Sequence, residues 1–103
     1  MDQIRVVFTT VPDVDVGSEI AKRVVEEELA ACVNIVPGLR SIYRWKGEIS
    51  DDSEALLIAK VRMDRLTAYE ARLSELHPYE VPEIIVLLPD HVSDAYLSWA
   101  MSS

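Results

Sequence analysis

Leu29-Ala-Ala-Cys-Val-Asn-Ile-Val-Pro-Gly-Leu-Arg-Ser-Ile-Tyr-Arg-Trp-Lys-Gly-Glu-Ile49 is the segment on which the rest of the predicted fold depends. It begins with small and β-branched apolar residues, which are typical of a buried central strand. Pro37-Gly38 then predicts a bulge or bend, because proline removes a backbone donor and glycine tolerates unusual dihedral angles. Lys46-Gly47 predicts a tight hairpin, so Glu48 and Ile49 begin a return strand.

Between Pro37-Gly38 and the hairpin, the residues alternate strictly. In a strand, alternate side chains point to opposite faces. One face carries Leu39, Ser41, Tyr43 and Trp45, and the other carries Arg40, Ile42 and Arg44. A ribbon of this length, with aromatic residues near its tip, extends beyond what one small domain covers. We therefore expect a neighbouring copy of the chain to cover it.

Length and composition narrow the classes of protein. The 103 residues predict a single domain spanning residues 1–103, and a hydrophobic content of 50% is enough for a core. A net charge of −8 argues against binding to nucleic acid or anionic membranes. The single cysteine, Cys32, excludes an intrachain disulfide and is typical of a reducing compartment. We expect a cytoplasmic protein without a membrane span or a secretion signal.

The other predicted elements follow from periodicity and from capping residues. Residues 4–10 form a strand, Asp13 caps a helix, and residues 51–53 form a turn or bulge before a strand at 54–61. Asp64 caps a second helix that Pro78 ends, residues 77–83 form a stiff connector, and residues 83–88 form the last strand. Ser93 or Asp94 caps a short terminal helix.

This order of elements, β-α-β-β-α-β with an extra C-terminal helix, predicts a ferredoxin-like α+β sandwich. Two helices then cover one face of a four-stranded antiparallel sheet. The opposite face carries too much apolar surface to remain in water, and association would bury it.

Two residues are candidates for metal binding, and each has a structural alternative. His77 either caps the end of the second helix or binds a metal through its neutral imidazole. Cys32 is either a small buried hydrophobic residue or, in a cleft with His77 and Glu48, a ligand for Cu or Zn. A nucleophilic Cys32–His77 pair is the enzymatic alternative, but no oxyanion-hole sequence flanks Cys32. We expect no catalytic residues.

The remaining candidates are one lysine, three aromatic residues and one further acid. Lys60 is a lone cation in an apolar strand, and it either extends to the rim or pairs with Glu48 or Glu80 or with an anionic ligand. Tyr43, Trp45 and Tyr79 fit interface anchors better than a base-stacking platform, given the acidic charge balance.

The sequence resembles the CutA family, which is named for divalent-cation tolerance. The matching motifs are the Val-Pro-Asp turn after the first strand, residues 29–38, Ser41-Ile-Tyr-Arg-Trp-Lys-Gly-Glu48, His77-Pro-Tyr-Glu-Val-Pro-Glu83 and the terminal Tyr96-Leu-x-Trp99. The resemblance spans nearly the whole chain, and the motifs are highly specific in combination.

The resemblance implies a ferredoxin-like subunit in a tight homotrimer, similar to PII-like signalling trimers. It also implies a cleft between subunits, lined by positions that match Cys32, Tyr43, Trp45, Glu48, Lys60, His77, Tyr79 and Glu80. Family members are associated with copper and other divalent cations. Thr9 and Leu76 stand where some members carry a cysteine and a second histidine. The soft ligands that remain are His77 and, as a helper, Cys32, so we expect a metal ion to be weakly held and not essential.

Two functions therefore remain open. The first is a non-enzymatic trimer that binds divalent cations at its clefts through His77, Cys32 and Glu48. The second is a signalling or interaction module whose clefts bind a small anionic metabolite or a partner protein through Lys60, Tyr43 and Trp45.

Overall fold

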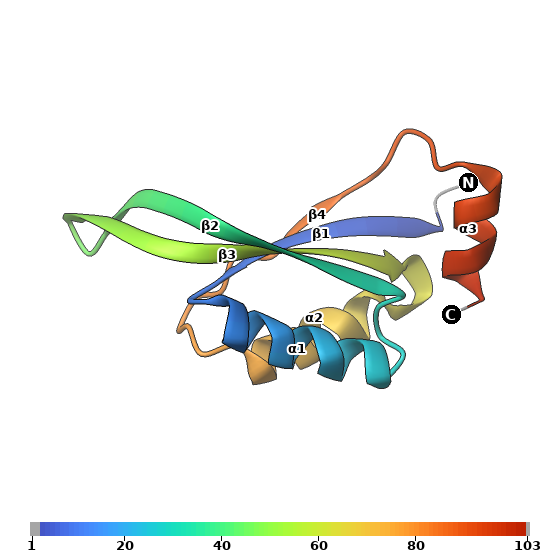
Figure 1. Cartoon of the computed structure of the whole chain (residues 1–103), viewed down its shortest axis with the longest axis horizontal. Coiled ribbons are helices and arrows are strands. Elements are labelled where there is room, and N and C mark those ends of the chain that lie inside the picture. Colours follow the sequence, from blue (N-terminus) through green and yellow to red (C-terminus); the bar gives the residue numbers. More distant parts are fainter. Residues whose placement is uncertain (1–2, 103) are drawn as a thin grey trace.

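The computed structural model describes residues 3–102, so residues 1–2 and 103 of the predicted domain lie outside the described part. Four strands form one antiparallel sheet in the order β2-β3-β1-β4, and α1 and α2 cover one of its faces (Figure 1). The strands are β1 (Ile4–Val11), β2 (Cys32–Trp45), β3 (Glu48–Arg62) and β4 (Ile85–Leu87). The helices are α1 (Val14–Glu26), the 3-10 turn η1 (Met63–Arg65), α2 (Leu66–Leu76) and α3 (Asp94–Met101). The predicted ferredoxin-like order and the extra C-terminal helix are confirmed.

The β2–β3 ribbon is the most extended part of the fold. Its register shifts between Val36 and Leu39, which confirms the bulge predicted at Pro37-Gly38. Lys46 and Gly47 form the hairpin with φ angles of 51° and 83°. The ribbon projects past the end of β1, as Figure 1 shows, and gives the subunit a length of 45 Å. Ile42, which is 67% exposed, illustrates how little of the ribbon one chain covers.

Four local predictions are wrong, each for a visible reason. The strand after Leu29 was predicted to be central, but β2 pairs only with β3 and forms an edge of the sheet. Residues 51–53 lie within β3, because Arg40 holds Asp51 across the ribbon at 2.7 Å and so keeps the polar run in the ladder. Asp64 does not cap α2 but lies in η1 and pairs with Arg62 at 2.8 Å. The last strand comprises only Ile85–Leu87, because it pairs with β1 over just those three positions.

The predicted start of the first helix is confirmed: Asp13 accepts a hydrogen bond of 2.8 Å from the Val16 backbone N–H. The second helix ends at Leu76, ahead of Pro78, as predicted. Ser93 occupies the N-cap position of α3, but its side chain makes no capping bond.

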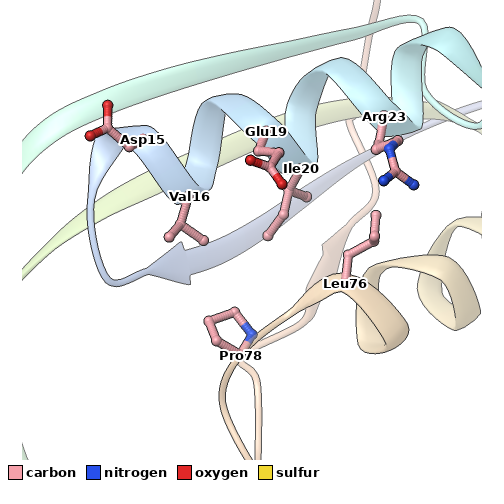
Figure 2. A pocket seen from close by; sticks show the side chains of 7 residues that line it. All are labelled: Asp15, Val16, Glu19, Ile20, Arg23, Leu76 and Pro78. Carbon is pink, nitrogen blue, oxygen red and sulfur yellow. The ribbon is translucent and has the colours of Figure 1, made fainter.

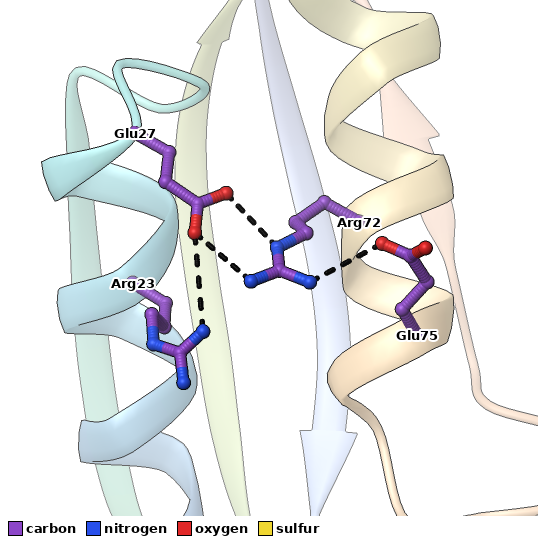
Figure 3. A network of polar contacts seen from close by, with 4 residues as sticks. All are labelled: Arg23, Glu27, Arg72 and Glu75. Carbon is purple, nitrogen blue, oxygen red and sulfur yellow. Dashed lines mark hydrogen bonds and ion pairs between the residues drawn. The ribbon is translucent and has the colours of Figure 1, made fainter.

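The core lies between the two helices and the sheet. Its largest buried side chains come from every layer: Val7, Val11, Val24, Leu57, Val61, Tyr69 and Leu73. Gly17 brings α1 close to the sheet, since a Cβ there would lie 3.1 Å from Val11 and 3.2 Å from Leu57. Across the outer side of the two helices, Arg72 of α2 donates bonds of 2.9 and 3.0 Å to Glu27 at the end of α1 (Figure 3). This contact holds the pKa of Glu27 below its usual value.

The sheet face opposite α1 and α2 is largely apolar. Strand pairing places on this face the side chains of Val6, Phe8, Val36, Leu56, Ile58, Ile85 and Leu87, together with those of Thr10, Cys32, Asn34 and Lys60. We call these residues the open face. All seven apolar members are half-buried or exposed, so one chain alone leaves this surface in contact with water.

Replacing Tyr69 with phenylalanine is expected to raise the free energy of unfolding. The Tyr69 hydroxyl is fully buried and has no hydrogen-bond partner among residues 3–102, a situation that costs about 1 kcal/mol or more. Burial also raises the pKa of Tyr69 to about 12. Unfolded chains therefore lose this proton first, and wild-type stability falls as the pH rises from about 10 to about 12. Urea unfolding at neutral and alkaline pH measures both effects. A variant that is less stable than wild type at neutral pH would contradict the prediction.

Candidate functional site

A cleft of about 460 Å³ lies at the base of the ribbon, where β2, β3 and the connector after α2 meet. It is lined by Thr10, Ser41, Ile42, Tyr43, Glu54, Tyr79 and Glu83. Glu54 and Glu83 make the lining acidic, and none of its residues is basic. We call this the acidic cleft.

Two tyrosine–carboxylate pairs stand beside each other here: Tyr79, Glu54 and Tyr43 line the acidic cleft, and Asp52 lies on β3 outside its lining. The Tyr79 hydroxyl donates to Glu54 at 2.5 Å, and the Tyr43 hydroxyl donates to Asp52 at 2.6 Å. Burial and the bond to Glu54 raise the pKa of Tyr79, and the bond to Asp52 raises that of Tyr43. Both phenols therefore remain protonated donors at neutral pH. They hold the side chains of Glu54 and Asp52 in place as hydrogen-bond acceptors.

Strand register explains how the two pairs meet. Asp52 and Glu54 precede Leu56, Ile58 and Lys60 at two-residue steps along β3. Both acids therefore lie on the open-face side of the sheet. Tyr43 reaches this side from β2, where Ser41 stands opposite Asp52. Tyr79 arrives from the connector after α2. Glu54 is 9% exposed, which is unusual for a carboxylate without a cationic partner in the described chain.

His77 fixes the position of Tyr79. It is 7% exposed, and its Nε2 lies 2.8 Å from the carbonyl oxygen of Thr10. A carbonyl can only accept, so Nε2 carries the proton and Nδ1 accepts the Tyr79 backbone N–H at 3.1 Å. The His77 and Tyr79 rings are in contact, with centroids 4.7 Å apart. Both ring nitrogens are engaged within the chain, in line with the structural alternative for His77.

Cys32 and Lys60 lie at the other end of the open face. They stand opposite each other on β2 and β3, and the Lys60 ammonium donates to the Asn34 side-chain oxygen. Burial, together with contact with Cys32, raises the pKa of Tyr96 on α3. Lys60 therefore points to the open face, and it is not part of the acidic cleft of its own chain.

Trp45 and Glu48 lie at the ribbon tip, where they face each other across the hairpin. The Lys46 ammonium sits 5.7 Å from the centroid of the Trp45 ring. Glu80 is exposed in the connector. Within residues 3–102, no three His, Cys, Asp or Glu side chains gather as a metal centre. His77, Cys32 and Glu48 thus lie in three separate places, and a site that combined them would need more than one chain.

The family resemblance implied a cleft between subunits that includes Tyr43 and Tyr79, and its extent across subunits stays a prediction. Within one chain both tyrosines line the acidic cleft, whereas neither Glu54 nor Asp52 was expected at a site. Glu54 was assigned only to the start of a strand, and Asp52 to a turn. The period of two in β3 was the available signal, because it puts both acids on the face of Leu56 and Ile58.

The chain is thus a small α+β sandwich, and carboxylate and hydroxyl oxygens line its candidate site. A family model described as "CutA1 divalent ion tolerance protein" matches residues 5–103. The divalent-cation tolerance protein CutA of Thermus thermophilus is 51% identical over 94 residues, which cover 91% of each chain. The chloroplastic protein CutA of Arabidopsis thaliana is 46% identical over 95% of this chain, which spans 54% of that protein.

Solved structures agree with this relationship. The Thermus thermophilus divalent cation tolerance protein superimposes with a TM-score of 0.90 at 49% identity, covering 94% of both chains. CutA from Synechococcus elongatus gives a TM-score of 0.95 at 37% identity, covering 99% of this chain and 90% of that one. The chain belongs to the CutA1 divalent ion tolerance family.

The names of the relatives do not describe a catalytic activity. Two relatives are named chloroplastic and one periplasmic, so the cytoplasmic location of this chain stays a prediction. No helix in the described part of the chain is long and apolar enough to cross a membrane.

Proposed function

We propose that the chain forms a homotrimer and binds divalent cations at acidic clefts completed by neighbouring subunits. The observation that carries the proposal is a nearly buried carboxylate, Glu54, in a cleft whose lining lacks a basic residue, with a second carboxylate, Asp52, held on the neighbouring Tyr43. A carboxylate held in this way is stabilised by a cation nearby.

The open face supports the trimer. Its apolar side chains run across all four strands, with Val6, Phe8, Leu56 and Ile58 on the two central ones, and β2–β3 extends the same side of the sheet past the subunit's own core. Packing three such faces together buries the apolar patch and brings each ribbon against a neighbour. In that arrangement the ribbon tip carries Glu48 and Trp45 to another subunit, so Glu48 adds a carboxylate from a second chain.

The chemistry of the acidic cleft favours a cation over an anion. Carboxylate and phenol oxygens suit hard divalent ions, whereas a soft ion such as copper prefers nitrogen and sulfur. His77 becomes a ligand only if Nδ1 releases the Tyr79 N–H, and Cys32 contributes only across a subunit boundary. These costs fit a weakly held ion. The alternative, an anionic metabolite bound through Lys60, requires that lysine to leave Asn34 and is disfavoured in the acidic cleft.

Glu54→Gln is expected to weaken cation binding by about tenfold, because it removes the central charge but keeps an oxygen that can accept from Tyr79. Calorimetric titration with Mn(II), Zn(II) and Cu(II), after removal of metal with a chelator, measures the effect. Glu26→Gln on the exposed side of α1 is the matched control and should bind as wild type does. Equal affinities for Glu54→Gln and wild type would remove the acidic cleft from the proposal. A loss of Cu(II) binding in His77→Ala alone would move the site to the imidazole.

A further inference from the structure

A second cavity, of about 310 Å³, lies away from the open face, between α1 and the C-terminal end of α2 (Figure 2). Val16, Ile20, Leu76 and Pro78 make its apolar floor. In Figure 2, Val16 and Ile20 point from α1 toward Pro78 and Leu76 on the other side of the gap. Asp15, Glu19 and Arg23 form its rim along α1. We call this the helix groove.

The charges on the rim are unbalanced. Asp15 and Glu19 are one helical turn apart and exposed, and neither has a cationic partner within ion-pair distance in residues 3–102. Two turns beyond Glu19, by contrast, Glu27 is held by Arg72 at 2.9 Å (Figure 3). Arg23 leans toward Glu27, at 4.0 Å. One end of the helix groove therefore carries two exposed carboxylates that lack an ion-pair partner in residues 3–102, and Asp15 among them also lies in the first turn of α1.

We propose that the helix groove binds an extended segment of a partner protein in which basic side chains flank an apolar one. The apolar side chain fills the floor, and the basic side chains lie against Asp15 and Glu19. Apolar anchors in small pockets supply most of the affinity in such contacts, and rim charges supply orientation and selectivity.

Charge decides between this occupant and the other candidates. In the proposed trimer a second copy contacts this chain through the open face, and its 18 acidic against 10 basic residues make it a poor partner for the acidic rim. An anionic membrane surface is repelled for the same reason. A basic-apolar segment is the class that satisfies both the floor and the rim.

The helix groove adjoins the acidic cleft through one short segment. Pro78 lines the groove and Tyr79 lines the cleft. His77, directly before them, ties this segment to β1 through its bond to the Thr10 carbonyl oxygen. An occupant in the groove thus rests on the residue next to the one that holds Glu54.

The test is a methyl NMR titration of the full chain with three synthetic peptides. Acetyl-Arg-Leu-Arg-amide is expected to shift the methyl signals of Val16, Ile20 and Leu76 in a saturable manner. Acetyl-Glu-Leu-Glu-amide lacks the basic side chains, and acetyl-Arg-Gly-Arg-amide lacks the apolar side chain. Both are expected to leave these methyl signals unchanged. The peptide is short and the rim is exposed, so binding is weak, and chemical shifts detect such binding directly.

A double variant, Asp15→Asn with Glu19→Gln, is expected to weaken acetyl-Arg-Leu-Arg-amide binding about fivefold, because exposed ion pairs are individually modest. Both changes keep side-chain size, and circular dichroism checks that α1 remains folded. Glu26→Gln, on the same helix but outside the groove, is the control and should bind as wild type does. The proposal is overturned if no peptide gives saturable shifts, if the acidic peptide binds equally well, or if the double variant binds as wild type does. Because Glu54 lies outside the helix groove, this result is independent of the cation site.

Discussion

Ile58→Glu is expected to dissociate the trimer while each subunit stays folded. Ile58 lies at the centre of the open face, between Phe8 on β1 and Asn34 on β2. Three such substitutions would place three carboxylates against apolar neighbours at the subunit contact. An unpaired charge in that setting costs several kilocalories per mole, which corresponds to at least a 100-fold loss in the association constant.

Sedimentation velocity over a dilution series, together with circular dichroism, separates assembly from folding. Val25→Glu is the matched control, since it makes the same kind of change at a 41% exposed position on α1. We expect Val25→Glu to sediment as wild type does and Ile58→Glu to sediment as a folded monomer. An Ile58→Glu variant that keeps the wild-type mass would show that the open face is not the contact.

Leu57→Ala is expected to destabilise the core of each subunit, whereas Ile58→Glu acts on the contact between subunits. Leu57 precedes Ile58 on β3, so it points to the helical side, where it is 1% exposed and lies against the α1 glycine, Gly17. Removing its buried methyl groups leaves a cavity between helix and sheet. The cost for such sites is about 3 kcal/mol.

Urea unfolding at matched protein concentrations measures this loss, because stability depends on concentration when folding and assembly are coupled. Val14→Ala, at a 41% exposed position at the start of α1, is the control and should change stability by less than about 0.5 kcal/mol. A small effect of Leu57→Ala, similar to that of Val14→Ala, would mean that the helix–sheet contact is not the main source of subunit stability.

Several local features of the fold could be predicted from the sequence. The two-residue period predicted which side chains of the ribbon share a face, and the capping residue Asp13 predicted where α1 begins. Pro37-Gly38 and Lys46-Gly47 predicted the bulge and the hairpin, because proline and glycine restrict or relax the backbone locally. Effects of this kind depend only on residues a few positions apart, so they can be predicted from a single sequence.

The cleft was harder to predict because its contacts are long-range. Asp51 and Asp52 resembled a turn, and only their partners across the ribbon, Arg40 and Tyr43, keep them in β3. The bond from Tyr79 to Glu54 joins residues 25 positions apart. His77 bonds to Thr10 across 67 positions, which no local pattern reveals. The sequence therefore identified several residues of the site, but not which of them touch.

The most direct measurement is the mass of the untagged wild-type protein by sedimentation equilibrium and native mass spectrometry after progressive dilution. We expect a species three times the chain mass of 11.6 kDa, because sister subunits cover the open face and bring a second chain's Glu48 to the acidic cleft. A stable, fully folded monomer at the same concentrations would contradict it, since the cleft would then have no second chain to complete it.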